Sequence, residues 1–284
     1  MSMQDPISPS GLPMPPAHTD VLPGVTPMPW SGWRSATTAR IALGRAGVAI
    51  PTDESLRFGW AHAMARDAIH TPLDVAALQA ELESAGHVVL TAKSRAPDRT
   101  SYLRRPDWGR QLDDSDAAHL RAVATTAVQP LDVCVVIGDG LSSLAVQRHC
   151  APLLAALVPL LAPGIRLAPL VVVQQARVAV SDDVGEALGA RLSVILIGER
   201  PGLSSPDSLG IYLTHGPRRG HNDALRNCIS NVRPEGLGYA LAAHKLAWLL
   251  QQALQRGYSG VALKDESAVQ TLQTPATPVT PAVG

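Results

Sequence analysis

A glycine-rich turn, Gly138-Asp-Gly-Leu-Ser-Ser143, is the first feature of this sequence that could carry chemistry. It follows an apolar run and precedes a helical pattern, and it imitates the GxGxxG fingerprint that places a phosphate at a helix N-terminus. The acidic residue that a dinucleotide site needs after the next strand is missing, since Gln174 and Gln175 stand there. The alternative is a structural turn in which Asp139 and the two serines cap the helix. Both interpretations stay open, but a dinucleotide is disfavoured.

Other familiar catalytic arrangements are missing from the sequence. It contains no GxSxG elbow and no Walker A motif, which argues against a hydrolase and against a P-loop NTPase. His215 and His221 lie near each other without cysteine or carboxylate at ligand spacing, so no metal site is predicted. The three cysteines form no CxxC pair, which fits a reducing cytoplasm. No catalytic set is therefore visible within this chain alone.

Polar and turn residues gather instead where predicted strands end. The three segments concerned are Gly198-Glu-Arg-Pro-Gly202, Asp207-Ser-Leu209 and Arg226-Asn-Cys-Ile-Ser-Asn231. In α/β proteins the carboxyl ends of the strands are where ligands bind. These segments are thus the candidate ligand-binding region.

The elements that would position these segments begin near residue 131. Continuous apolar runs predict strands at 133–137, 167–173, 192–197 and 211–214, and helices are predicted at 141–161, 181–190 and 239–255. Strands that are apolar throughout and alternate with helices indicate a mainly parallel sheet covered on both faces. This region is predicted to be a Rossmann-like, doubly wound α/β domain.

The signals before residue 130 are helical. Thr52 begins one predicted helix, with acidic residues in its first turn. Thr71 is the expected N-cap of the next, with Pro72 at the first helical position and Gly86 after its end. An earlier helix rich in Ala and Arg is expected to end at Gly47.

Four parts follow from these patterns. Residues 1–30 form a proline-rich, flexible arm, and residues 31–130 a helical N-terminal domain. Residues 131–266 form the α/β domain, and residues 267–284 a flexible tail with three further prolines. The predicted fold class is α/β, with the helical domain preceding the doubly wound one.

Composition limits the partners of the chain. Its 284 residues contain 24 basic and 24 acidic side chains, and only 17% of residues are charged. A net charge of zero argues against electrostatic binding to nucleic acid or to an anionic membrane. The longest apolar run, residues 153–162, is too short to span a bilayer. A chain with so few charged residues is expected to bury part of its surface against a protein partner and to be poorly soluble alone.

Several ordered motifs resemble one family, the small (light) subunits of ethanolamine ammonia-lyase. The motifs are Thr38-Ala-Arg-Ile-Ala-Leu-Gly-Arg-Ala-Gly47, Ala61-His-Ala-Met-Ala-Arg-Asp67, Tyr102-Leu-Arg-Arg-Pro-Asp107, Gly138-Asp-Gly-Leu-Ser-Ser143, Ala176-Arg-Val-Ala-Val180, Gly198-Glu-Arg-Pro-Gly-Leu203 and Cys228-Ile-Ser-Asn231. The resemblance covers roughly residues 30 to 265 and leaves out the proline-rich ends.

The resemblance implies an adenosylcobalamin-dependent lyase that converts ethanolamine to acetaldehyde and ammonia by a radical mechanism. It implies a large TIM-barrel subunit that binds the substrate, with six large and six small chains in the assembly. The small subunit would cover the cobalamin, and the absence of a catalytic set is then expected, because the cofactor carries the radical chemistry. A cytoplasmic location follows, and relatives are often enclosed in an ethanolamine-utilisation microcompartment.

The family's cobalamin contacts in this subunit match Val178, Glu199 and Cys228. A corrin carries a rim of primary amides, which a carboxylate such as Glu199 can bind as an acceptor. The structural alternatives to cobalamin binding are an ion pair of Glu199 with a nearby arginine and, for Cys228, a thiol that is only buried in the core. No Asp-x-His-x-x-Gly sequence is present, so cobalamin is expected to keep its own benzimidazole ligand (base-on).

Two other functions compete with this reading. One is a free-standing α/β enzyme that binds a nucleotide-type cofactor at Gly138–Ser143, and it predicts activity from the isolated chain. The other is a non-catalytic scaffold subunit, and it predicts that changes at Glu199 and Cys228 leave cofactor affinity intact.

Overall fold

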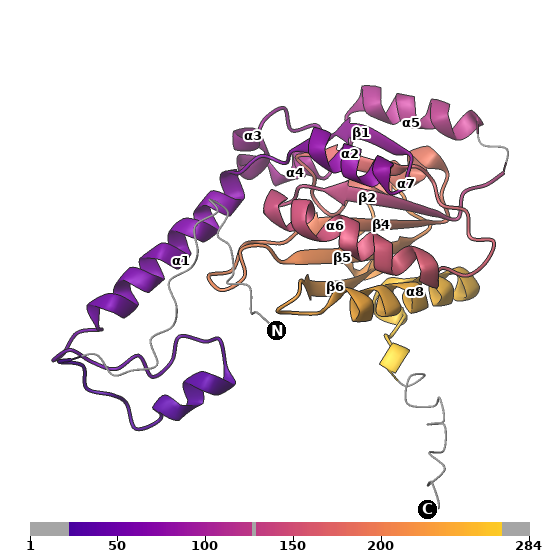
Figure 1. Ribbon diagram of the computed structural model, residues 1–284. Coiled ribbons are helices and arrows are strands. Elements are labelled where there is room, and N and C mark those ends of the chain that lie inside the picture. The colour runs from indigo at the N-terminus through magenta and orange to yellow at the C-terminus, as the bar shows by residue number, and fades with distance from the viewer. Residues whose placement is uncertain (1–22, 127–128, 269–284) are drawn as a thin grey trace, which may run out of the picture.

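A six-stranded sheet with helices on both faces forms the centre of the molecule (Figure 1). The structure is a computed structural model, and it describes residues 23–126 and 129–268. The strand order in the sheet is β1-β3-β2-β4-β5-β6. The strands are β1 (Val89–Lys93), β2 (Val133–Gly138), β3 (Leu170–Gln174), β4 (Leu192–Gly198), β5 (Leu209–His215) and β6 (Arg226–Val232).

The sheet is mixed, which corrects part of the expected topology. Strands β1, β3, β2 and β4 are parallel, as predicted for β2, β3 and β4, with Val136 opposite Val171 and Ile195. Strand β5 runs antiparallel to β4, and β6 antiparallel to β5. Only loops, residues 199–208 and 216–225 with the short turn η3 (Asp223–Leu225), connect these strands, and antiparallel neighbours need no crossover helix. The α/β class is confirmed, but the parallel order ends at β4.

The helices follow the predicted order from residue 131 onward. The α-helices are α1 (Thr52–His70), α2 (Val75–Ser84), α3 (Arg99–Arg104), α4 (Pro106–Gly109), α5 (Asp114–Thr126), α6 (Ser143–Leu157), α7 (Val180–Leu188) and α8 (Tyr239–Arg256). Besides η3, the 3₁₀ turns are η1 (Ser31–Ala36), η2 (Val158–Leu160) and η4 (Gly260–Ala262). Gly257 ends α8 in the left-handed conformation, as its position predicts.

Two hydrophobic layers hold these helices on the sheet. On one face α2, α6 and α8 bury leucines such as Leu82, Leu153 and Leu249 against Val135. On the other face α5 and α7 pack through Leu120 and Val184. Residues 143–160, which include α6, are long and apolar enough to cross a membrane by length and composition, with a mean hydropathy of 1.2. Here α6 packs on the sheet, against β2 and β4, and beside α8, as a core helix does.

One part of the sheet is less covered than the rest. Helix α8 packs against β4, β5 and β6 on one face, whereas α7 on the opposite face packs against β2 and β4. On the α7 side, β5 and β6 are therefore bordered by loops and by α4. Tyr212 is half-buried there, and Cys228, its partner across the strands, is exposed.

The predicted helical N-terminal domain is wrong at residues 89–93. This segment is strand β1, which pairs with β3 along its whole length and buries Val89 and Ala92 at the edge of the sheet. A domain division at residue 130 stays a prediction, and this pairing weighs against it. Residues 1–22 and 269–284 lie outside the described residues. The predicted arm is thus described only over 23–30 and the tail only over 267–268.

Helix boundaries in the N-terminal part were predicted in part. Helix α1 begins at Thr52, as expected. Thr71 ends this helix by donating its N–H to Asp67, and Asp74 is the cap of α2, accepting from the N–H of Ala77 at 3.0 Å. The helix expected before Gly47 does not form, since Gly44 and Gly47 adopt left-handed turns.

Candidate functional site

A pocket of about 330 Å³ lies on the open part of the sheet, beside β5 and β6. It is bordered by the loop between β3 and α7 and by α4, so four separate segments of the chain build it. Its lining comprises Pro106, Arg110, Arg177, Val178, Ala179, Tyr212, Asp223, Arg226 and Cys228. Three arginines face one aspartate, which makes the lining basic in a chain without net charge.

Two of the three predicted contact residues line this pocket. Val178 enters it from the loop after β3, and Cys228 from β6. Cys228 lies inside strand β6, not in a segment after the end of a strand as its sequence pattern predicts, and its thiol is 3.2 Å from the hydroxyl of Ser230. The pocket brings together residues that are 50 positions apart in the sequence.

The third predicted residue, Glu199, lies beside the pocket and does not line it. It directly follows β4, and its carboxylate lies over Gly210, where a Cβ would be 2.9 Å from Oε1. That Cβ would also be 3.2 Å from the ring of Tyr212, which does line the pocket. The missing side chain at Gly210 therefore leaves room for the carboxylate on the same face of the sheet.

Hydrogen bonds hold the Glu199 carboxylate through one of its oxygens. Oε2 accepts from the hydroxyl of Ser208 and, at 3.3 Å, from the backbone N–H of Asn231. No arginine forms an ion pair with Glu199 in the described part of the chain, so a structural ion pair as the role of Glu199 is not supported. Oε1 accepts no hydrogen bond from the described residues, and it can accept one from a ligand.

Tyr212 adds a hydroxyl to the site. Burial raises the pKa of this side chain, and the nearby Cys228, Glu199 and Asp223 raise it further. The phenol therefore stays protonated at neutral pH and can donate a hydrogen bond.

The loop that carries Arg177 and Val178 is held by Asp139. This buried carboxylate accepts the backbone N–H groups of Gln175 at 2.9 Å and Ala176 at 2.8 Å. Gln175 has a φ of 56°, a left-handed conformation that costs free energy outside glycine, and the two hydrogen bonds offset that cost. Burial raises the pKa of Asp139 despite these hydrogen bonds.

The glycine-rich turn therefore has a structural role, and the hypothesis that it binds a nucleotide is weakened. Asp139 is engaged with the neighbouring loop, and the hydroxyl of Ser142 caps α6 at Ala145 while donating to the carbonyl of Pro206. Gly140 lies so close to β4 that a Cβ would be 2.1 Å from the carbonyl oxygen of Gly198. Two N–H groups that a phosphate could accept from at this turn, those of Leu141 and Ala145, already donate to the carbonyl of Gly198 and the hydroxyl of Ser142.

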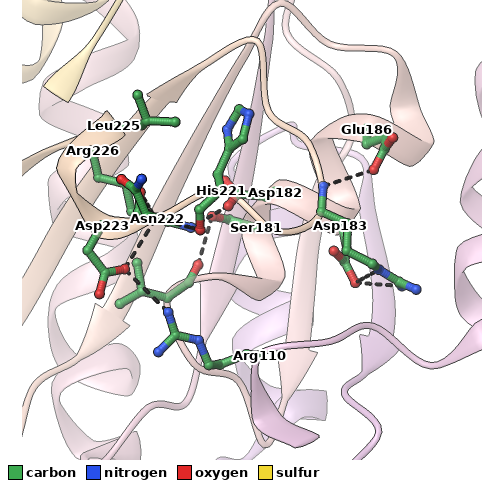
Figure 2. A network of polar contacts seen from close by, with 12 residues as sticks. Arg110, Ser181, Asp182, Asp183, Glu186, His221, Asn222, Asp223, Leu225 and Arg226 are labelled. Atoms are coloured by element: carbon green, nitrogen blue, oxygen red, sulfur yellow. Dashed lines mark hydrogen bonds and ion pairs between the residues drawn. The ribbon is translucent and has the colours of Figure 1, made fainter. Parts of the chain in front are cut away.

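A network of ion pairs fixes the loop between β5 and β6 (Figure 2). Arg226 is buried and binds the buried Asp182 of α7. The same guanidinium contacts Asp223 at 3.2 Å and donates to the carbonyl of Asn222 at 2.7 Å. Arg110, which directly follows α4, reaches Asp223 at 3.4 Å. The walls of the pocket are thus tied to one another.

The sequence did not single out Arg110, Arg177 or Tyr212, whereas Arg226 stands in one of the segments predicted to bind a ligand. Arg110 and Arg177 stand within or beside two of the recognised motifs, but single arginines in an arginine-rich chain give no signal of their own. Among the described residues, no three His, Cys, Asp or Glu side chains lie close enough together to hold a metal ion.

Comparison with known proteins agrees over most of the chain. Residues 27–264 match the family described as "Ethanolamine ammonia-lyase light chain". The ethanolamine ammonia-lyase small subunit of Ralstonia nicotianae is 57% identical over 250 residues, covering 88% of this chain and 93% of that protein. Its counterpart in Azotobacter vinelandii is 56% identical over 248 residues, covering 87% and 92%. That of Pseudomonas fluorescens Pf-5 is 55% identical over 247 residues, covering 87% and 90%.

Proposed function

The chain belongs to the family of ethanolamine ammonia-lyase small subunits, and we propose that it completes the cobalamin site of that ammonia-lyase together with a larger subunit. The observation that carries the proposal is the pocket, because it joins Val178 and Cys228 and has Glu199 at its side. The three residues that the family resemblance implies as cobalamin contacts therefore lie on one open face of the sheet.

The chemistry of this face fits a corrin. The corrin rim carries primary amides, which both donate and accept hydrogen bonds. Oε1 of Glu199 offers an acceptor, and the hydroxyl of Tyr212 and the pocket arginines offer donors. A pocket of about 330 Å³ can hold only part of so large a molecule. The remainder would be covered by the partner subunit, with this chain closing one side and excluding water.

Adenosylcobalamin, when bound, supplies an organic radical by homolysis of its cobalt–carbon bond, and the enzyme uses it to convert ethanolamine to acetaldehyde and ammonia. We place the substrate in the barrel of the larger subunit and assign no catalytic residue to this chain. Val178, Glu199 and Cys228 would hold and orient the cofactor. Its benzimidazole would stay on the cobalt, because no motif in this sequence offers a histidine in its place.

Exposed apolar side chains support the assembly with a larger subunit. Trp30, Trp33, Val48, Ile50 and Phe58 all lie on the N-terminal segment or on α1, and each is about half exposed or more, up to complete exposure at Val48. Helix α1 projects away from the sheet (Figure 1). Exposed large apolar side chains gathered on one part of a chain are typical of a protein interface. We assign it to the large subunit, in a cytoplasmic assembly of six large and six small chains; enclosure in a microcompartment remains part of the proposal.

Co-expression of this chain with the large subunit tests the proposal. The purified complex is expected to take up adenosylcobalamin and to show its visible spectrum, whereas neither chain alone should do so. A large subunit that binds cobalamin equally well alone would leave only the scaffold function. Turnover of a substrate by the isolated chain, with a cofactor that lacks cobalt, would support the nucleotide-binding alternative instead.

The Glu199→Gln change is expected to weaken adenosylcobalamin binding by about tenfold to a hundredfold. It keeps the shape of the side chain but replaces a charged acceptor by a neutral one, and a charged hydrogen bond is worth about 1.5–3 kcal/mol. Equilibrium titration of the complex, followed by visible absorbance, measures the effect. Turnover at saturating cofactor should change much less.

The matched control is Glu83→Gln on the exposed side of α2, which should leave the affinity unchanged. If Glu199→Gln left cofactor affinity intact but separated the subunits, Glu199 would be an interface residue and its assignment would be wrong.

A further inference from the structure

Arg177 carries a charge that the described protein does not neutralise. Arg226 is paired with Asp182 and Asp223, and Arg110 with Asp223, but no carboxylate among the described residues lies within ion-pair distance of Arg177. Its Nε is buried and donates to no acceptor in that part of the chain. Among the described residues, the hydrogen bond that its guanidinium donates is a long one, 3.4 Å, to the carbonyl of Tyr102. A buried donor without an acceptor is costly unless a ligand supplies one.

The surrounding structure holds this guanidinium in one place. It lies over the ring of Tyr102 at 4.2 Å, and Arg99 lies near the same ring at 4.7 Å. Tyr102 is fully buried and donates its hydroxyl hydrogen to the carbonyl of Ala176 at 3.0 Å. A Cβ at Gly109 would be 2.8 Å from Cγ of Arg177, so only glycine permits this packing. The motif around Tyr102 therefore acts to orient Arg177 at the pocket.

An orientated guanidinium without a carboxylate partner is suited to an anionic oxygen group, and arginine binds phosphate groups in a bidentate way. The amides of a corrin are neutral, but the nucleotide loop of cobalamin contains one phosphodiester. Resting on the proposed function, we propose that Arg177 binds this phosphodiester and that the pocket thereby selects the complete cofactor over one that lacks the nucleotide.

Two ligands and one variant separate this role from general damage to the site. Cobinamide shares the corrin amides with cobalamin but lacks the nucleotide loop and its phosphate. In the complex with the large subunit, Arg177→Gln should raise the Kd of cobalamin by about tenfold to a hundredfold. The Kd of cobinamide should be the same in the wild type and the variant. Both constants are measured by titration with visible absorbance, without turnover.

The dependence on salt gives a second measurement that needs only cobalamin. The wild-type Kd should rise between low and high potassium chloride concentration, since salt screens the arginine and the phosphate. The rise should be clearly smaller in Arg177→Gln. Arg177→Lys retains the charge and the packing stem, so it should lose less affinity than Arg177→Gln and keep the salt dependence.

Arg105→Gln is the matched control, because Arg105 belongs to the same motif and lies over Trp108 at 4.6 Å but pairs with Asp107 and does not line the pocket. It should change neither constant. An equal loss for cobalamin and cobinamide, or an unchanged salt dependence in Arg177→Gln, overturns the inference while leaving the proposed function standing. Cobalamin binding that does not need this chain at all overturns the proposed function itself.

Discussion

Replacing Arg226 by methionine is expected to lower the free energy of unfolding by about 3–5 kcal/mol, because it leaves a buried carboxylate without its cation. The side chains of Arg226 and Asp182 are only 2% and 1% exposed, so water cannot take the place of the guanidinium. The loop between β5 and β6 would also lose its hydrogen bond at Asn222. Urea unfolding followed by circular dichroism measures the change.

The size of this loss should depend on pH. Burial raises the pKa of Asp182 to about 6, although Arg226 and Thr214 act to lower it. Its unfolded pKa is about 3.9, so the stability that this group contributes is complete below about pH 4 and is lost as the pH rises through 6. Without Arg226 the pKa of folded Asp182 rises further. The difference between the wild type and Arg226→Met should therefore grow from pH 6 to pH 8.

Two controls test this account of the buried pair. Arg95→Met breaks the exposed pair with Asp114 and should cost no more than about 1 kcal/mol. The double variant Asp182→Asn with Arg226→Met removes both charges and should recover much of the stability that the single variant loses. A single variant as stable as the wild type at pH 8 would show that the pair contributes little.

The second large effect is expected for Gly140→Ala, which should destabilise the fold by about 3 kcal/mol or more. The residue has a φ of +59°, and a Cβ would be 2.1 Å from the carbonyl oxygen of Gly198. That carbonyl accepts the N–H of Leu141 at 2.9 Å, so it cannot move away without losing a hydrogen bond. The strain adds to the ordinary cost of a left-handed alanine.

Gly164→Ala provides the comparison, because Gly164 also has a positive φ, +89°, but has no atom within 4 Å of a Cβ. It should cost only about 1–2 kcal/mol, the backbone term alone. Thermal unfolding of the two variants under the same conditions measures both. Equal losses at the two positions would mean that the contact between Gly140 and β4 relaxes easily.

The strands that are apolar throughout were predictable from the sequence, and those at the edges were not. Strands β2, β3 and β4 are buried on both faces, and this requires the continuous apolar runs that were recognised. Strands β1 and β6 lie at the two edges of the sheet and contain exposed polar residues, so their sequences resemble loops. Thr71 was misplaced because Asp74, three residues later, is an equally suitable cap.

The candidate site was predictable only where family motifs marked it. Val178 and Cys228 lie together in the pocket, and the motif around Glu199 follows β4 as expected. The role of Tyr212 could not be foreseen, because it depends on the antiparallel register that sets it opposite Cys228. The same holds for Arg177, whose free charge follows from the positions of carboxylates that are distant in sequence.

The pairing of β1 with β3 also determines the timing of folding during synthesis. Val89 pairs with Leu170, about 80 residues later in the chain. At about 5–20 residues per second, the ribosome releases β1 several seconds or more before its partner. The apolar N-terminal segment emerges still earlier, and β6, which carries Cys228, is the last of these strands to appear. The exposed apolar side chains of the N-terminal segment are thus synthesised before the sheet can form. This order favours synthesis beside a partner subunit or binding of the nascent chain by chaperones.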